Sequence, residues 1–160
     1  MNEIIGLDVG CGGTRHENFV GLDIRKTVGA DIIADAHFLP FEDETFSVVY
    51  SSHVLEHVKN PYIALMEFRR VSKKLVVIRV PMSNPYADPK EHIYSWTPAT
   101  LCNFLKCGFQ DVKTSYHLYN EEGLNPIKRK LKIFQQIVLG FLLRRKIGEL
   151  LAVCQKSKTL

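Results

Sequence analysis

A glycine-rich turn near the amino terminus has the residue types that let a protein hold a nucleotide-type cofactor. The apolar run 4–9 predicts a short buried strand, and the glycines within 10–13 close it with a turn in which the backbone can approach a ligand without a Cβ in the way. Asp8 places a carboxylate beside this turn, and Asp23 ends the next apolar stretch. We therefore predict a cofactor lying across the ends of two adjacent strands, with Asp23 accepting hydrogen bonds from ribose hydroxyls.

A second group of residues that could do chemistry is rich in histidine. His53, Glu56 and His57 have the H-x-x-E-H spacing of one class of zinc enzymes, with two histidines four positions apart. A metallohydrolase built on these residues is one interpretation, but no third metal ligand is evident in the sequence, and we expect no metal. His92 and Tyr94, in a proline-containing stretch, are candidates for a catalytic base or a substrate clamp.

The hydrophobic pattern predicts the elements that position these residues. The connection between the first two strands is only the nine residues 10–18, where a parallel crossover normally takes about 10–12 or more. The usual first crossover helix must therefore be cut to about one turn or replaced by an extended link, and the link before residue 31 is again short. The expected strands are 4–9, 19–24, 31–34, 46–52, 75–80, 109–119 and 149–154; residues 53–58 are expected to open a helix, and further helices are expected at 61–71 and 97–108.

Length and composition are those of one ordinary soluble domain over residues 1–160. Of these residues, 46% are hydrophobic and 24% are charged. The four cysteines, Cys11, Cys102, Cys107 and Cys154, form no C-x-x-C pair and show no disulfide-like spacing. A cytoplasmic location is therefore the natural expectation, and no signal peptide is expected because the chain enters a strand at once.

Charge is distributed unevenly along the chain. Residues 1–123 hold twelve Lys and Arg against sixteen Asp and Glu, a net charge of −4, whereas residues 124–160 hold nine against one, a net charge of +8. Within the basic part, residues 125–147 predict a basic amphipathic helical insertion. We expect this segment to pack on the domain, to form a homodimer with a second copy, or to contact an anionic membrane peripherally. We do not expect nucleic acid as a partner.

Several motifs resemble one family in both type and order. Leu7-Asp8-Val9-Gly10-Cys11-Gly12-Gly13 resembles motif I of the class I S-adenosylmethionine (AdoMet)-dependent methyltransferases. Later motifs resemble the small type-11 group of that family, and they are Asp35-Ala36, Leu39-Pro40-Phe41, 46–58, 68–71, and Trp96-Thr97 leading to Gly108-Phe109. The resemblance implies an α/β fold with a Rossmann-like, mostly parallel sheet whose last strand, 149–154, is antiparallel.

The resemblance also implies a cofactor and a reaction. AdoMet would donate a methyl group to a small-molecule or membrane-linked acceptor, with His53 and His92 as the candidate catalytic residues. The residues expected to bind the cofactor are Asp8, Gly10, Cys11, Gly12, Asp23, Ile24, Asp35, Ala36 and Ser51. Of these, Asp35 and Ala36 would meet the adenine, and the backbone of Ser51 would face the methionine end. The alternative is a methyltransferase-like module that binds or scaffolds without catalysis, which the shortened first crossover favours.

Overall fold

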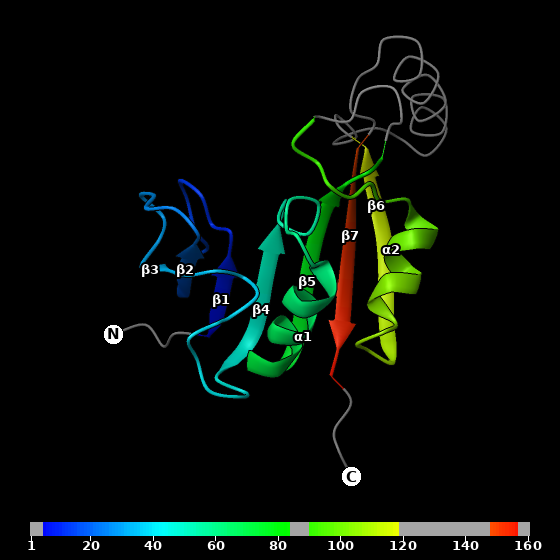
Figure 1. Cartoon of the computed structure of the whole chain (residues 1–160). Coiled ribbons are helices and arrows are strands. Elements are labelled where there is room, and N and C mark those ends of the chain that lie inside the picture. The colour runs from blue at the N-terminus through cyan, green and yellow to red at the C-terminus, as the bar shows by residue number, and fades with distance from the viewer. Residues whose placement is uncertain (1–4, 84–89, 119–147, 157–160) are drawn as a thin grey trace, which may run out of the picture.

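The computed structural model describes residues 5–83, 90–118 and 148–156, which form one seven-stranded sheet with two helices (Figure 1). The strands are β1 (Gly6–Val9), β2 (Phe19–Asp23), β3 (Ile32–Ile33), β4 (Phe46–Ser52), β5 (Ser72–Pro81), β6 (Asp111–Leu118) and β7 (Gly148–Gln155), and the helices are α1 (Pro61–Val71) and α2 (Pro98–Leu105). The basic insertion expected at 125–147 lies outside the described residues.

The strand order of the sheet is β3-β2-β1-β4-β5-β7-β6. Strands β1 to β5 pair in parallel, and β7 enters antiparallel between β5 and β6. The fold class and the antiparallel last strand predicted from the sequence are therefore confirmed. The chain order reverses between β1 and β4, and open α/β sheets bind ligands beyond the carboxyl ends of their strands at such a point.

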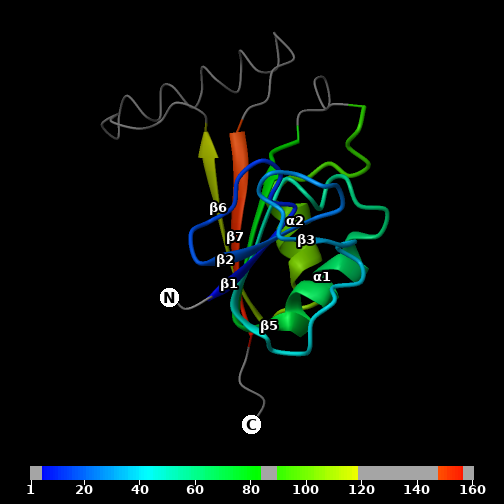
Figure 2. The same cartoon turned by 90° about the vertical axis from the view of Figure 1, so that its left-hand side faces the viewer.

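One face of the sheet is buried under the helices. Val49, Val76 and Ile78 in the central strands are fully buried, and α1 and α2 lie on the same side of the sheet (Figure 2). Because Leu65 and Phe68 are three positions apart on α1, both reach this core, and both are fully buried. This buried layer fixes the strands whose carboxyl ends carry the candidate site.

Both helices begin at the caps that the sequence indicates. The side chain of Asn60 accepts hydrogen bonds from two backbone N–H groups of the first turn of α1. Thr97 and Thr100 form a reciprocal capping box at the start of α2. Each cap is followed by a proline at the first helical position, where a missing N–H is harmless.

The connections on either side of β2 contain turns in place of helices. Residues 10–18 join β1 to β2, and residues 24–31 join β2 to β3, without a helical segment. This confirms the shortened crossovers. Within the ranges that the structure describes, no helix covers the second face of the sheet (Figure 2). Val48, Val77 and Val153 lie on that face and are only half-buried.

One predicted element was wrong. Residues 53–58 form a turn and do not open a helix. The cause is local, because His53 has a φ of +56°, which a right-handed helix cannot contain, and the backbone N–H of His57 closes a turn instead. The bounds of β3 and β5 also differ from the predicted 31–34 and 75–80, since β3 is shorter and β5 longer.

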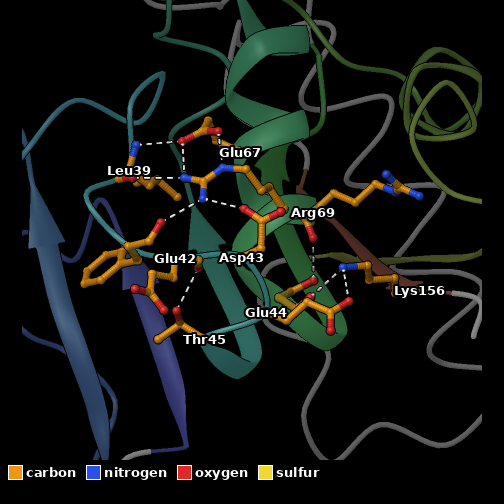
Figure 3. Close-up of polar contacts among 11 residues, drawn as sticks. Leu39, Glu42, Asp43, Glu44, Thr45, Glu67, Arg69 and Lys156 are labelled. Atoms are coloured by element: carbon orange, nitrogen blue, oxygen red, sulfur yellow. Dashed lines mark hydrogen bonds and ion pairs between the residues drawn. The ribbon is translucent and has the colours of Figure 1, made fainter.

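A network of ion pairs fixes the link before β4 to the end of α1 (Figure 3). The guanidinium of Arg70 donates to Glu67 at 2.7 Å, to Asp43 at 3.0 Å and to the carbonyl oxygens of Leu39 and Phe41. Hydrogen bonds from Arg70 hold the pKa of the Glu67 carboxyl below its usual range. The network lies at the amino edge of the central strands.

Candidate cofactor and acceptor site

The glycine turn after β1 is folded back onto β2. The backbone N–H groups of Gly10 and Cys11 both donate to the carbonyl oxygen of Leu22, at 2.7 and 3.2 Å. Gly10 and Gly12 have φ of +74° and +60°, which favours glycine at both positions. A Cβ on Gly10 would lie 2.2 Å from Cγ2 of Val54, whereas a Cβ on Gly12 would have no neighbour within 4 Å. Glycine is therefore needed at position 10 for packing, whereas Gly12 lies at the open side of the turn.

Through its carboxylate, Asp8 binds a residue of the link 10–18, which joins β1 to β2 in place of the usual first crossover helix. Its carboxylate is 4% exposed, and Oδ2 accepts hydrogen bonds from the backbone N–H of His16 at 3.2 Å and from the His16 ring at 3.0 Å. The His16 ring in turn contacts Tyr50 on β4, with ring centroids 4.3 Å apart. The structure therefore gives Asp8 a structural role, and its contact with a cofactor stays a prediction.

Asp23 lies at the open side of the glycine turn. Its carboxylate is 6% exposed, and Oδ2 accepts the backbone N–H of Gly12 at 3.0 Å while Oδ1 accepts that of Arg25 at 3.0 Å. Each carboxylate oxygen has a second lone pair, so the group can still accept from a ligand hydroxyl. The next residue, Ile24, is 64% exposed and presents apolar surface at the same edge.

Asp35 and Ala36 follow β3 and lie in the loop next to Asp23. The backbone N–H of Ala34 donates to the carbonyl oxygen of Asp23 at 3.0 Å, which ties the two strand ends together. Oδ1 of Asp35 accepts the backbone N–H of His37 at 2.9 Å and also contacts the His37 ring. These interactions, the backbone N–H first, lower the pKa of the Asp35 carboxyl. Ala36 is buried, and its contact with adenine stays a prediction.

Ser51 and Cys11 complete the predicted cofactor set. Ser51 lies opposite Val9 in the pairing of β4 with β1, at the carboxyl ends of both strands. Its hydroxyl is buried and has no hydrogen-bond partner among the described residues. Burial, aided by the nearby charges of Asp8 and Asp23, raises the pKa of the Cys11 thiol, which therefore stays neutral and suits a small loop residue better than a nucleophile.

His53 sits in a polar cluster at the mouth of β4. Its Nδ1 lies 3.1 Å from Glu56 and its Nε2 lies 3.0 Å from Glu149, so that both ring nitrogens face carboxylates. Arg79 on β5 forms an ion pair with Glu149 and reaches the Tyr50 hydroxyl at 3.5 Å. The hydrogen bond to Glu56, followed by the one to Glu149, raises the pKa of His53.

Sequence reasoning missed Glu149 and Arg79 as members of this cluster. The one available signal was that Glu149 is the single acid in a basic part of the chain, at the start of an apolar strand. The pairing of β7 with β5, with Glu149 opposite Pro81, is what brings it to the carboxyl edge. Interactions with His53 and Arg79 outweigh burial and lower the pKa of the Glu149 carboxyl.

His92, the second predicted catalytic residue, lies beside a different set of residues. Its ring packs edge-on against that of His57, with centroids 4.9 Å apart. Ligand atoms of Glu56, His57 and His92 all lie within 4.8 Å of one another. His53 and His92 thus lie near the same carboxylate, that of Glu56.

A cavity of about 450 Å³ lies away from this cluster, at the amino edge. Its lining residues are Asp43, Glu44, Met66, Glu67, Arg69, Arg70 and Lys156. Their charges are largely paired with one another, including Lys156 with Glu44 at 2.8 Å. The cavity therefore belongs to the ion-pair network of Figure 3 and not to the candidate site.

Comparison with known proteins gives a family match and a sequence relative. Residues 7–78 match the family described as a methyltransferase domain. An uncharacterized protein of Methanocaldococcus jannaschii is 35% identical over 131 residues, which cover 69% of this chain and 56% of the relative. The chain thus spans little more than half the length of that relative.

Solved structures share the fold. A SAM-dependent methyltransferase from Archaeoglobus fulgidus is similar with a TM-score of 0.62 at 19% identity, over 96% of this chain and 86% of that one. Phosphoethanolamine N-methyltransferase 2 of Haemonchus contortus, solved in complex with S-adenosyl-L-methionine, has a TM-score of 0.68 at 13% identity, over 98% of this chain and 49% of that one. The described strands therefore have the arrangement found in methyltransferases.

Proposed function

We propose, on the premise that residues 7–78 match the methyltransferase-domain family, that this chain transfers a methyl group from AdoMet to an acceptor. The observation that carries the proposal is the Asp23 carboxylate, which the backbone N–H of Gly12 holds at the open side of the glycine turn. The remaining lone pairs of Asp23 suit two ribose hydroxyls. Asp35 and Ala36, tied to the same strand end, would then meet the adenine, and Ser51 the methionine end.

AdoMet supplies a sulfonium methyl group that is already activated for in-line displacement. The chain's contribution is position, which is worth up to about 7–11 kcal/mol when two reacting atoms are held in attack geometry. The carboxyl ends of β1 and β4 would fix the cofactor. The turn 53–58 and the loop after β5 would fix the acceptor beside it.

The geometry around His53 does not suit the role of a general base. Both ring nitrogens of His53 face carboxylates, on Glu56 and Glu149, and donating to both leaves no lone pair to take a proton. We therefore assign His53 a positioning role at the acceptor and leave His92 as the candidate catalytic residue. An acceptor nitrogen or carboxylate can attack the methyl group without prior proton removal.

Calorimetry with AdoMet and with its demethylated product tests the proposal. We expect both to bind, and tighter binding of the product would support turnover. Failure of both to bind would contradict the enzyme proposal and favour the non-catalytic binding or scaffold module.

The acceptor is proposed to be a small molecule or a membrane-linked molecule. What supports the second kind is the sequence of 125–147, where basic residues flank an apolar stretch, as they do in helices that lie at a membrane interface. Attraction to an anionic leaflet is worth about 1 kcal/mol per basic residue and is screened by salt. Neither described helix is long and apolar enough to cross a membrane.

Vesicle sedimentation tests the membrane contact. We expect binding to anionic vesicles and not to neutral ones, lost at high salt, by a protein whose solution mass is that of a monomer. A dimer that binds neither kind of vesicle would instead assign 125–147 to contact between two copies. A monomer that binds neither kind would contradict the membrane proposal. A cytoplasmic location is proposed because all four cysteines are free thiols.

A further inference from the structure

The carboxylate of Glu56 is buried with half of its bonding capacity unused. The side chain is 0% exposed, and Oε1 is 3.1 Å from Nδ1 of His53. Oε2 is also buried and has no hydrogen-bond partner among the described residues. An unsatisfied buried carboxylate oxygen is costly, because nothing replaces the water that it has lost. Its location therefore points to a ligand that completes this side of Glu56.

Two histidines stand beside Glu56. One ligand atom from each of Glu56, His57 and His92 lies within 4.8 Å of the others. The His57 ring has its Nδ1 3.1 Å from the carbonyl oxygen of Glu91, and a carbonyl there can only accept, so Nδ1 carries the proton. The lone pair of neutral His57 then belongs to Nε2. This arrangement, with one ring nitrogen donating to a backbone carbonyl, is the one that orients histidines toward metal ions.

We propose that Glu56, His57 and His92 form a binding site for a divalent transition-metal ion, with Zn²⁺ as the ion that this ligand set suits. Two histidines and one carboxylate are the protein ligands of several catalytic zinc sites, which keep a fourth position open. The sequence offered no evident third ligand, and the structure supplies it in His92, from a loop 35 positions after His57 in the chain (92 − 57). This trio differs from the H-x-x-E-H set, because His53 faces the other oxygen of Glu56.

The backbone holds the two halves of the site together. The carbonyl oxygen of Glu56 accepts hydrogen bonds from the N–H groups of Ile93 at 2.8 Å and Tyr94 at 3.2 Å. The Tyr94 hydroxyl also donates to the carbonyl oxygen of Lys59 at 3.1 Å. The turn after β4 and the loop after β5 are thus joined by backbone hydrogen bonds directly after His92, so its approach to Glu56 does not depend on one side-chain contact.

Access and spacing also fit an ion. Glu56 is buried, His92 is half-buried and His57 is exposed, so the site is open to solvent on the side of His57. Ligand atoms around a tetrahedral Zn²⁺ are about 3.3–3.6 Å apart, given metal–ligand bonds of about 2.0–2.2 Å. Ligand atoms that lie up to 4.8 Å apart in the trio would therefore move closer together when the ion binds.

The test measures metal content and affinity of the full chain, with any polyhistidine tag removed. After dialysis against a chelator, the protein is titrated with Zn²⁺, and with Co²⁺ as a spectroscopic probe of coordination. We expect about one ion per chain, with nitrogen and oxygen coordination. His57→Gln and His92→Gln should each weaken Zn²⁺ binding by at least the roughly 10–100-fold that loss of an outer partner costs. Because His57 is exposed, His57→Gln should keep the fold, which its melting temperature reports.

Two matched variants control for other zinc ligands. His16→Gln removes a histidine outside the trio, and Cys107→Ser removes the exposed thiol. Both should bind Zn²⁺ as the unmodified chain does. The proposal is overturned if the chelated chain takes up no Zn²⁺, or if His57→Gln and His92→Gln bind it as tightly as the controls. AdoMet calorimetry on the same samples is independent, so either proposal can fail alone.

Discussion

The Nε2 atom of His53 lies 3.0 Å from Oε1 of Glu149, although the two residues are 96 positions apart. Glu149 is the second residue of β7, the antiparallel strand inserted between β5 and β6. The turn after β4 is therefore held from one side by its own neighbour Glu56 and from the other by a strand at the far end of the chain. The geometry of the acceptor side depends on β7 being docked.

The contact predicts a stability difference between two acidic residues. Glu149→Gln leaves Arg79 without its carboxylate partner and removes one of the two carboxylates that face His53. Because those two side chains are 40% and 34% exposed, solvent screening reduces the expected loss to about 1–2 kcal/mol, below the 3–5 kcal/mol of a fully buried pair. Glu44→Gln breaks a more exposed pair with Lys156 and should cost no more than about 0.5 kcal/mol. Urea unfolding measures the loss of stability in both variants, and equal losses would contradict the stabilising role assigned to Glu149.

The backbone of His53 gives a second prediction. Its φ of +56° costs a residue with a Cβ about 1–2 kcal/mol, which glycine avoids. Glycine gains more entropy on unfolding, by about 0.4–1 kcal/mol. His53→Gly should therefore be more stable than His53→Ala by about 0.5–1 kcal/mol. Both variants lose the same carboxylate contacts, so their difference in unfolding free energy isolates the backbone, and a less stable glycine variant would refute the strained turn.

Asp23 should control the affinity for AdoMet. Asp23→Asn keeps the shape of the side chain and one acceptor for the backbone N–H of Gly12 or Arg25. Each lost hydrogen bond to a charged group is worth about 1.5–3 kcal/mol, so the Kd should rise about tenfold or more.

A neighbouring acid provides the control for that measurement. Asp31 also accepts a backbone N–H of β2, from Gly21 at 2.9 Å, but it lies with Arg15 and not at the glycine turn. Asp31→Asn should leave AdoMet affinity within a factor of about 2, which is about 0.4 kcal/mol. If Asp23→Asn and Asp31→Asn have the same calorimetric Kd, the cofactor assignment is wrong.

The two glycines of the turn should differ in their tolerance of a methyl group. Gly10→Ala combines a positive φ with a clash against Val54, and we expect a loss of about 2–4 kcal/mol. Gly12→Ala meets no atom within 4 Å and should cost about 1 kcal/mol. Chemical denaturation compares the two. In a Val54→Ala background the Gly10→Ala loss should shrink, and an unchanged loss would rule out the clash.

The pH dependence of stability should report the Glu67–Arg70 pair. The folded-state pKa of Glu67 lies below its unfolded value, so the unfolded chain binds the proton more tightly. The stabilisation is complete above the unfolded pKa of about 4.3 and is lost as pH falls through the lower folded pKa. The unfolding free energy of Glu67→Gln should therefore fall less than that of the unmodified chain between about pH 5 and about pH 3. Glu17→Gln, at an exposed position, should keep the full slope.

Sequence patterns were sufficient for the elements whose signals are local. The bounds of β4 and α1 agree with prediction because an uninterrupted apolar run and a capped, proline-led amphipathic stretch are each decided by neighbours in the chain. The short link 10–18 likewise predicted a missing helix from its length alone. The prediction that residues 53–58 open a helix was wrong, because the positive φ at His53 prevents a helix in a stretch whose residue types are compatible with one.

The contacts between side chains of the site could not be predicted from the sequence, because they depend on which strands pair. The approach of Glu149 to His53 requires β7 to insert beside β5, and no periodicity in either segment states that order. Similarly, His92 approaches His57 only because the loop after β5 hydrogen-bonds to the turn after β4. The residues predicted to bind the cofactor have a local signal, since each lies at or close to the carboxyl end of a strand.

The charges around the glycine turn suit a cofactor without phosphate groups. The turn has no helix behind it, so the positive end of a helix dipole, which supports phosphate groups in many nucleotide sites, is missing. Its amides are also largely committed: those of Gly10 and Cys11 to Leu22, and that of Gly12 to Asp23. With the Asp8 and Asp23 carboxylates alongside, a pyrophosphate would meet repulsion and few donors. AdoMet has no phosphate and carries a sulfonium cation, so we expect a turn with these charges to favour it over a dinucleotide.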